Sequence, residues 1–162
     1  MIYFYVILSI ALVPILNNFF DILKQSYSWW LVPLLVVGFF VAIVLLHMLF
    51  VVLNFRFMSY ESNPDKGQKY YRGLIKATVS LLVPLAGVEI NLSGMSPDEV
   101  PTDRKMMFVC NHQHDFDPAV IWHTFPENHI GFIGKKEIYT TMPLIGRVMH
   151  KLHGLAIDRE NN

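Results

Sequence analysis

Residues 106–118 read MMFVCNHQHDFDP. The apolar run at 106–110 is short and uninterrupted, which is typical of a central buried strand. Asp117 and Pro118 are favoured at the N-cap and at the first position of a helix, so a helix is predicted from there to about Phe125. A strand that leads through a polar loop into a helix indicates an α/β sheet domain.

Elements predicted on both sides of this segment continue the alternation. Apolar residues at helical spacing predict a helix over 69–86. Strands are expected at 88–92, 129–133 and 155–157, and helical pieces at 136–139 and 143–153. These elements fit one α/β domain, which we place at 69–162.

The helix predicted over 69–86 carries Lys69, Arg72 and Lys76 on one face. Such a face suits an amphipathic helix that lies on an anionic cytoplasmic leaflet. It equally suits an ordinary core helix with a basic side in solvent. The pattern does not decide between these interpretations.

The first third of the chain is strongly apolar. Residues 2–20 carry no charged side chain, and His47 is the only ionisable one in 29–55. About 20 helical residues span the hydrocarbon layer, so two transmembrane helices are predicted, joined as a hairpin by the short segment 21–28. A cleaved signal peptide is the alternative for the first helix, but there is no basic start and no small-x-small site.

The distribution of basic residues predicts the orientation of this anchor, residues 1–55. Only Lys24 precedes Phe55, whereas Arg56 and several lysines and arginines follow it closely. The positive-inside rule therefore places residue 56 onward in the cytoplasm of a multi-pass cell-membrane protein. Residues 56–68 are polar around Pro64 and are interpreted as a linker.

Composition limits the partners and the redox setting. Thirteen basic and thirteen acidic side chains give zero net charge, so nothing indicates a nucleic-acid partner. Cys110 is the only cysteine, which excludes an intrachain disulfide and suits a reducing compartment. We expect it to fill a buried strand position, with a catalytic thiol as the alternative.

His112 and Asp117 are candidates for general-base chemistry. A neutral imidazole, with an ordinary pKa near 6.5, can take the proton of an attacking alcohol, and a carboxylate can orient it and stabilise the imidazolium. This is the logic of a Ser-His-Asp triad in which the substrate hydroxyl replaces serine. The pair alone is weak evidence, because surface loops hold such pairs by chance.

The surrounding motif resembles the Asn-His-x-x-x-x-Asp-Pro signature of the glycerolipid acyltransferases. A second block, residues 134–159, resembles their second signature and ends in GLAIDR. The likeness is to the bacterial 1-acylglycerol-3-phosphate acyltransferases. It implies a fatty acyl transfer from acyl-CoA or acyl carrier protein to a lysophosphatidic acid, giving phosphatidic acid in phospholipid biosynthesis, without a metal or other cofactor.

The resemblance also assigns residues. His112 would be the base and Asp117 its partner, while Arg159 and Lys135 would bind the acceptor phosphate, as an arginine fork and a lysine charge suit phosphate oxygens. The alternatives are a solvated basic turn for Lys135 and an ion pair with a neighbouring carboxylate for Arg159. The implied fold is a transmembrane helical hairpin followed by a partial acyltransferase α/β sheet domain.

Two departures from the family pattern leave other functions open. His114 stands where the family usually has a small polar residue, and the third signature, Glu-Gly-Thr-Arg, does not follow by Asn162. We therefore expect a truncated member, and an inactive one is an alternative. A metal-dependent hydrolase is a further alternative, because His112, His114, Asp115 and Asp117 cluster loosely as metal ligands do.

Overall fold

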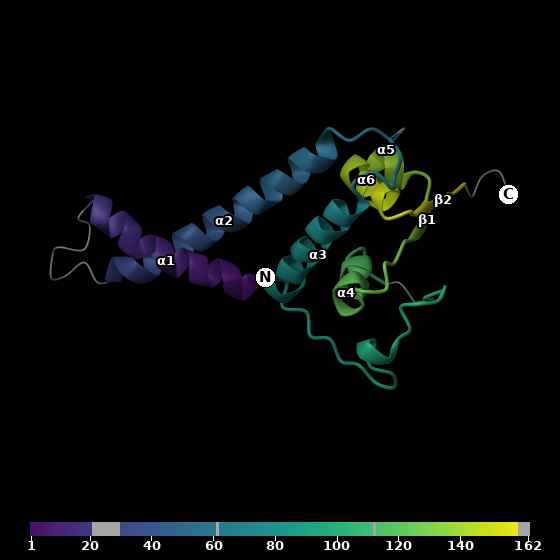
Figure 1. Ribbon diagram of the computed structural model, residues 1–162, viewed down its shortest axis with the longest axis horizontal. Coiled ribbons are helices and arrows are strands. Elements are labelled where there is room, and N and C mark those ends of the chain that lie inside the picture. The colour runs from purple at the N-terminus through teal and green to yellow at the C-terminus, as the bar shows by residue number, and fades with distance from the viewer. Residues whose placement is uncertain (21–29, 61, 112, 159–162) are drawn as a thin grey trace. The chain divides into compact units, whose positions relative to one another are not determined.

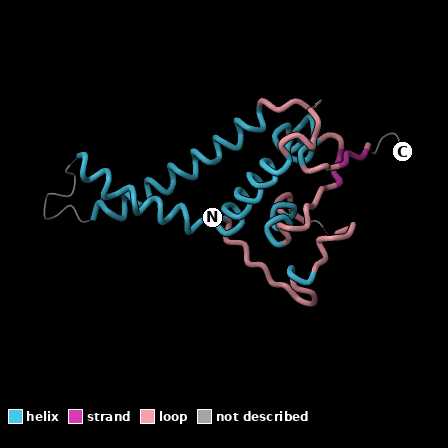
Figure 2. The backbone as a smooth tube through the Cα atoms, in the orientation of Figure 1, coloured by secondary structure: helices cyan, strands magenta, loops and turns pink. Residues whose placement is uncertain are grey.

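The computed structural model describes residues 1–20, 30–60, 62–111 and 113–158, with side chains described through Asn18 in the first range. Two compact units, Met1–Leu53 and Asn54–Asn162, make up the chain. Figures 1 and 2 show a mostly helical chain with one small sheet. The elements are α1 (Ile2–Phe20), α2 (Leu31–Arg56), α3 (Gln68–Leu85), the 3₁₀ turn η2 (Pro97–Glu99), α4 (Asp117–Thr124), β1 (Ile133–Lys135), α5 (Ile138–Thr141), α6 (Pro143–Lys151) and β2 (Leu155–Ile157).

The first unit contains the two apolar helices. Among the described residues, α2 is the helix whose length and composition would let it cross a membrane, and the apolar part of α1, Ile2–Asn18, is shorter. The hydroxyl of Tyr5 bonds with His47 Nδ1 at 2.9 Å, which links α1 to α2. One membrane helix is thus supported by length and composition; the predicted connection at 21–28 lies outside the described residues, and the hairpin stays a prediction.

The second unit is built around α3. The helix forms over nearly the predicted range, and Leu74 and Ile75 of its predicted apolar face are buried, whereas Leu85 is exposed. The buried residues of α3 are Leu74, Ile75, Val79, Leu81 and Val83. Helices α4 and α6 both contact α3. The core also contains Trp122 of α4 and Met149 of α6.

The described sheet consists of β1 and β2, which pair in parallel with Ile133 opposite Leu155 and Lys135 opposite Ile157. Helices α5 and α6 form the crossover between them, as parallel strands require a long connection. The strand at 155–157 is confirmed. The strand predicted at 129–133 is displaced and runs over Ile133–Lys135 instead.

Two predicted strands, at 88–92 and 106–110, are wrong. The structure has irregular backbone in both places, Met107 and Val109 are 81% and 82% exposed, and Cys110 is exposed instead of buried. A strand forms only where a neighbouring chain satisfies its backbone N–H and C=O groups. In the described residues, neither segment finds such a neighbour, so apolar content alone does not make a strand here.

The region predicted as a linker packs against α6. Three basic side chains of α6, called here the α6 clamp, bond to main-chain carbonyl oxygens of residues 58–66. The bonds are Arg147 Nε to Met58 O at 2.9 Å, His150 Nε2 to Ser62 O at 2.8 Å, and Lys151 Nζ to Asn63 O and Lys66 O at 3.1 and 3.0 Å. Lys151 is only 2% exposed, and this burial lowers the pKa of its ammonium group.

Gly146 of α6 sits where this packing is closest. A Cβ added there would lie 2.8 Å from Tyr139 Cα and 2.9 Å from the Tyr60 hydroxyl oxygen. The hydroxyl itself is held, because it donates to the carbonyls of Tyr139 and Pro143. Neither neighbour can move away without breaking other contacts.

Gly146→Ala is therefore expected to lower the free energy of unfolding by about 1–3 kcal/mol, the usual effect of overpacking. Gly73→Ala is the matched control, since a Cβ at this helical glycine of α3 meets nothing within 4 Å. Alanine should stabilise α3 there by about 0.5–1 kcal/mol. Denaturant unfolding of the full chain in detergent, followed by circular dichroism, measures both. An unchanged or raised stability in Gly146→Ala would contradict the packing described.

Candidate functional site

The loop before α4 is organised by Asp117. Its Oδ2 accepts hydrogen bonds from the backbone N–H groups of Gln113 and His114, both at 2.9 Å, and its own N–H donates to the His114 carbonyl at 3.0 Å. Asp117 is the first residue of α4, and Phe116 occupies the N-cap position that the sequence predicts for Asp117. The carboxylate thus folds back over the loop, where residues 113 and 114 supply the donors.

His112 lies outside the described residues, so its geometry is not described. Gln113 is its neighbour in the chain, and the Gln113 N–H is bonded to Asp117. The Asp117 carboxylate, which is predicted to orient His112, is therefore held by the N–H group of the next residue, Gln113. The pairing of the two side chains stays a prediction.

His114, the residue that departs from the family pattern, has a place in the loop. Its Nδ1 accepts a hydrogen bond from the Phe116 N–H at 3.1 Å, which requires that Nδ1 carry no proton. His114 thus stabilises the turn that leads into α4. This hydrogen bond explains the presence of His114 in the loop without a catalytic role.

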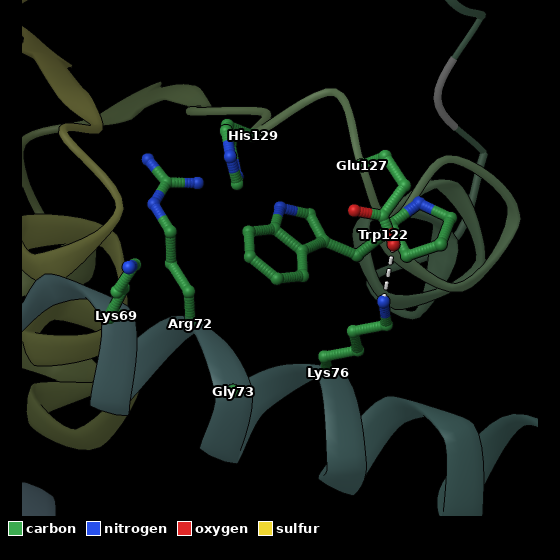
Figure 3. Close-up of a pocket in the computed structure, with 8 residues that line it drawn as sticks. Lys69, Arg72, Gly73, Lys76, Trp122, Glu127 and His129 are labelled. Atoms are coloured by element: carbon green, nitrogen blue, oxygen red, sulfur yellow. Dashed lines mark hydrogen bonds and ion pairs between the residues drawn. The ribbon is translucent and has the colours of Figure 1, made fainter. Parts of the chain in front are cut away.

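Helix α4 is anchored through Trp122. The indole is 3% exposed, and its Nε1 donates to the Ile130 carbonyl at 2.9 Å. The guanidinium of Arg72, from α3, lies over the ring at 5.8 Å from its centroid (Figure 3). These contacts hold the helix that begins with Asp117, so the loop is supported by the core of the second unit.

Of the two residues predicted to bind phosphate, the structure describes Lys135. Lys135 is the last residue of β1 and is exposed; it is opposite Ile157, which precedes Asp158. Lys136 bonds to Asp158 Oδ2 at 3.0 Å. Arg159 lies outside the described residues. Lys135 thus lies at the carboxyl end of β1, beside the carboxyl end of the parallel strand β2.

The sequence does not decide whether the basic face of α3 lies on a membrane or in solvent. In the structure, part of this face packs against the region of α4. Arg72 packs on Trp122, and Lys76 pairs with Glu127, which follows α4. This contact between α3 and the α4 region was missed, because helical spacing shows which residues share a face but not what that face meets. The single tryptophan in the second unit was the available signal.

Residues 91–162 match a family model described as Acyltransferase. No curated protein and no solved structure matches the chain. The matched segment includes the loop organised by Asp117 and both strands. The carboxy-terminal part of the chain is therefore similar to the acyltransferase family, and this similarity suggests acyl transfer in lipid metabolism.

The alternative of a metal site depends on His112. Among the described residues, which do not include it, no group of three or more histidine, cysteine or carboxylate side chains is placed to hold a metal ion. Asp117 in that loop is bonded to backbone N–H groups. The metal hypothesis stays a prediction that chelation can test.

Proposed function

We propose that this chain is a membrane-bound acyltransferase that moves a fatty acyl group from acyl-CoA or acyl carrier protein to 1-acylglycerol-3-phosphate, giving phosphatidic acid. The observation that carries the proposal is the acyltransferase match over the segment that contains the Asp117 loop. The apolar helix α2 supports a membrane location, where the lipid acceptor resides. The acyltransferase domain then lies on the cytoplasmic side, where the thioester donor is available.

In the proposed reaction the acceptor hydroxyl attacks the thioester carbonyl carbon. His112 takes the hydroxyl proton as the new C–O bond forms, and Asp117 stabilises the resulting imidazolium. Collapse of the tetrahedral intermediate breaks the C–S bond, and the proton on His112 passes to the thiolate. The products are phosphatidic acid and the free thiol, and no protein nucleophile or metal takes part.

Lys135 and Arg159 are proposed to bind the acceptor phosphate. The parallel register supports this pairing, because Lys135 lies opposite Ile157, two residues before Arg159. Lys136 is engaged with Asp158, so the two adjacent lysines have different environments. An arginine and a lysine together match the charge of a phosphate monoester.

The test of this function is acyl transfer by the full chain in detergent. A labelled acyl thioester is offered with lysophosphatidic acid, glycerol 3-phosphate or lysophosphatidylcholine, and the lipid product is identified. Labelled phosphatidic acid with the first acceptor alone is the expected result. Hydrolysis of the thioester without transfer, or equal transfer to lysophosphatidylcholine, would contradict the proposed acceptor.

Metal chelation should leave this activity unchanged. The base, its carboxylate partner and the phosphate-binding cations are all protein side chains, so the rate with a strong chelator should equal the rate without it within about twofold, which is well below the effect of losing a catalytic metal. The measurement is the same assay after incubation with the chelator. A loss of activity that a divalent metal restores would favour the metal-dependent alternative.

A further inference from the structure

A pocket of about 160 Å³ lies between α3 and the region of α4, and neither Asp117 nor Lys135 lines it. Figure 3 shows its side chains around the indole of Trp122, with Arg72 and His129 near one edge of the ring and Lys76 and Glu127 at another. The charged and aromatic residues that line it are Lys69, Arg72, Lys76, Trp122, Glu127 and His129.

The positive charge of this pocket is only partly balanced. Glu127 forms an ion pair with Lys76, and the hydrogen bond from Lys76 lowers the pKa of the Glu127 carboxyl. Within the described part of the chain, Lys69 and Arg72 make no ion pair with a carboxylate. Two cations on one wall of the pocket therefore remain without an anion from the described residues.

Arg72 shows the strongest sign of a missing ligand. Its Nη1 is buried and has no hydrogen-bond partner among the described residues, and burial lowers the pKa of the guanidinium. A buried donor without a partner is unfavourable. The Cζ atom of Arg72 lies over the Trp122 ring, 5.8 Å from its centroid, and this contact does not use the in-plane N–H groups of the guanidinium.

We propose that this pocket binds a phosphate group, held by Lys69 and Arg72 against Trp122. A guanidinium fork and a nearby ammonium match the oxygens and the charge of a phosphate. The pocket accommodates a tetrahedral oxyanion and is smaller than the roughly 300–1,000 Å³ sites that enclose whole organic ligands. The phosphate comes either from a lipid headgroup or from a soluble phosphate.

The site is independent of the proposed acyl transfer. Trp122 lies five residues after Asp117, about 7.5 Å along the helix axis. Phosphate bound there would add a bridge between α3 and α4 without touching the loop at 113–117. His112→Ala is therefore expected to bind phosphate as the wild type does, so failure of the two proposals can be distinguished.

Calorimetric titration of the full chain in detergent with inorganic phosphate, at constant ionic strength with chloride as reference, tests the site. Saturable binding is expected, and Arg72→Gln and Lys69→Gln should each weaken it by at least about tenfold, the usual loss for a charge-assisted bond. Lys105→Gln makes the same charge change at an exposed residue that does not line the pocket, and should bind as wild type.

A second arm identifies the source of the phosphate. Short-chain phosphatidic acid and phosphatidylcholine of the same chain length are titrated in the same detergent. Because the proposed acyl-transfer site also binds phosphatidic acid, only binding that Arg72→Gln or Lys69→Gln weakens counts for this pocket. Such binding of phosphatidic acid as well as inorganic phosphate supports a lipid headgroup, and such binding of inorganic phosphate alone supports a soluble ligand. No binding of either, or wild-type binding in a folded Lys69→Gln or Arg72→Gln variant, overturns the proposal. Lys69 is exposed, so its variant keeps the test available if Arg72→Gln does not fold.

Discussion

Replacing His112 with alanine is expected to lower kcat for acyl transfer by about 10² to 10⁴, the range that general-base catalysis contributes. The hydroxyl of the acceptor would then have to lose its proton to water. The KM for lysophosphatidic acid should change little, because the proposed phosphate-binding residues are Lys135 and Arg159. Steady-state kinetics of the full chain in detergent, with a labelled thioester, separates the two constants.

His114→Ala is the matched control for the base. It removes an imidazole two residues away whose contact in the structure is with the Phe116 N–H. A decrease of less than about tenfold is expected, since a single backbone bond in an exposed loop is lost. If His114→Ala abolished transfer while His112→Ala retained it, the assignment of the base would be wrong.

Asp117→Ala should have a second large effect, again about 10² to 10⁴ in kcat, because the carboxylate is proposed to orient the base and stabilise its charged form. This variant also removes the acceptor of two backbone hydrogen bonds, from Gln113 and His114. Loss of the loop geometry would add to the loss of charge. A second variant is needed to separate the effect of the lost charge from the effect of the lost loop geometry.

Asp117→Asn separates them, because an amide oxygen can still accept the two N–H bonds while the negative charge is gone. Hydrogen exchange of the loop amides should resemble wild type in Asp117→Asn and increase in Asp117→Ala. If charge is the main contribution, kcat falls nearly as far in the asparagine variant. Asp115→Asn, an exposed neighbour, controls for the change of net charge and should keep activity. Wild-type kcat in Asp117→Asn would exclude the proposed partner role.

Local sequence patterns predicted the elements whose stability is decided locally. The helix α3 follows from the spacing of Leu74, Ile75 and Leu82, and α6 begins at Pro143, a residue favoured at the start of a helix. The strand β2 was also predicted at its observed position. Each of these signals lies within one segment of the chain.

Features that depend on a distant partner were not predictable. The run at 106–110 has the composition of a buried strand but no strand neighbour in the described part of the chain, where only β1 and β2 pair. Asp117 was identified as a candidate, whereas its two bonds within the loop depend on a turn that the sequence does not specify. The contact between the basic face of α3 and Trp122 likewise joins residues far apart in the chain, since Trp122 lies 50 residues after Arg72.

The α6 clamp has a consequence for how this chain can vary. Three basic side chains of α6 bond to the carbonyl oxygens of Met58, Ser62, Asn63 and Lys66. Every residue has a main-chain carbonyl, so these four positions are held without regard to their side chains. Sequence drift in that region would leave these bonds in place wherever the backbone conformation is kept. A change of Arg147, His150 or Lys151 to a residue without a side-chain N–H donor would remove such a bond.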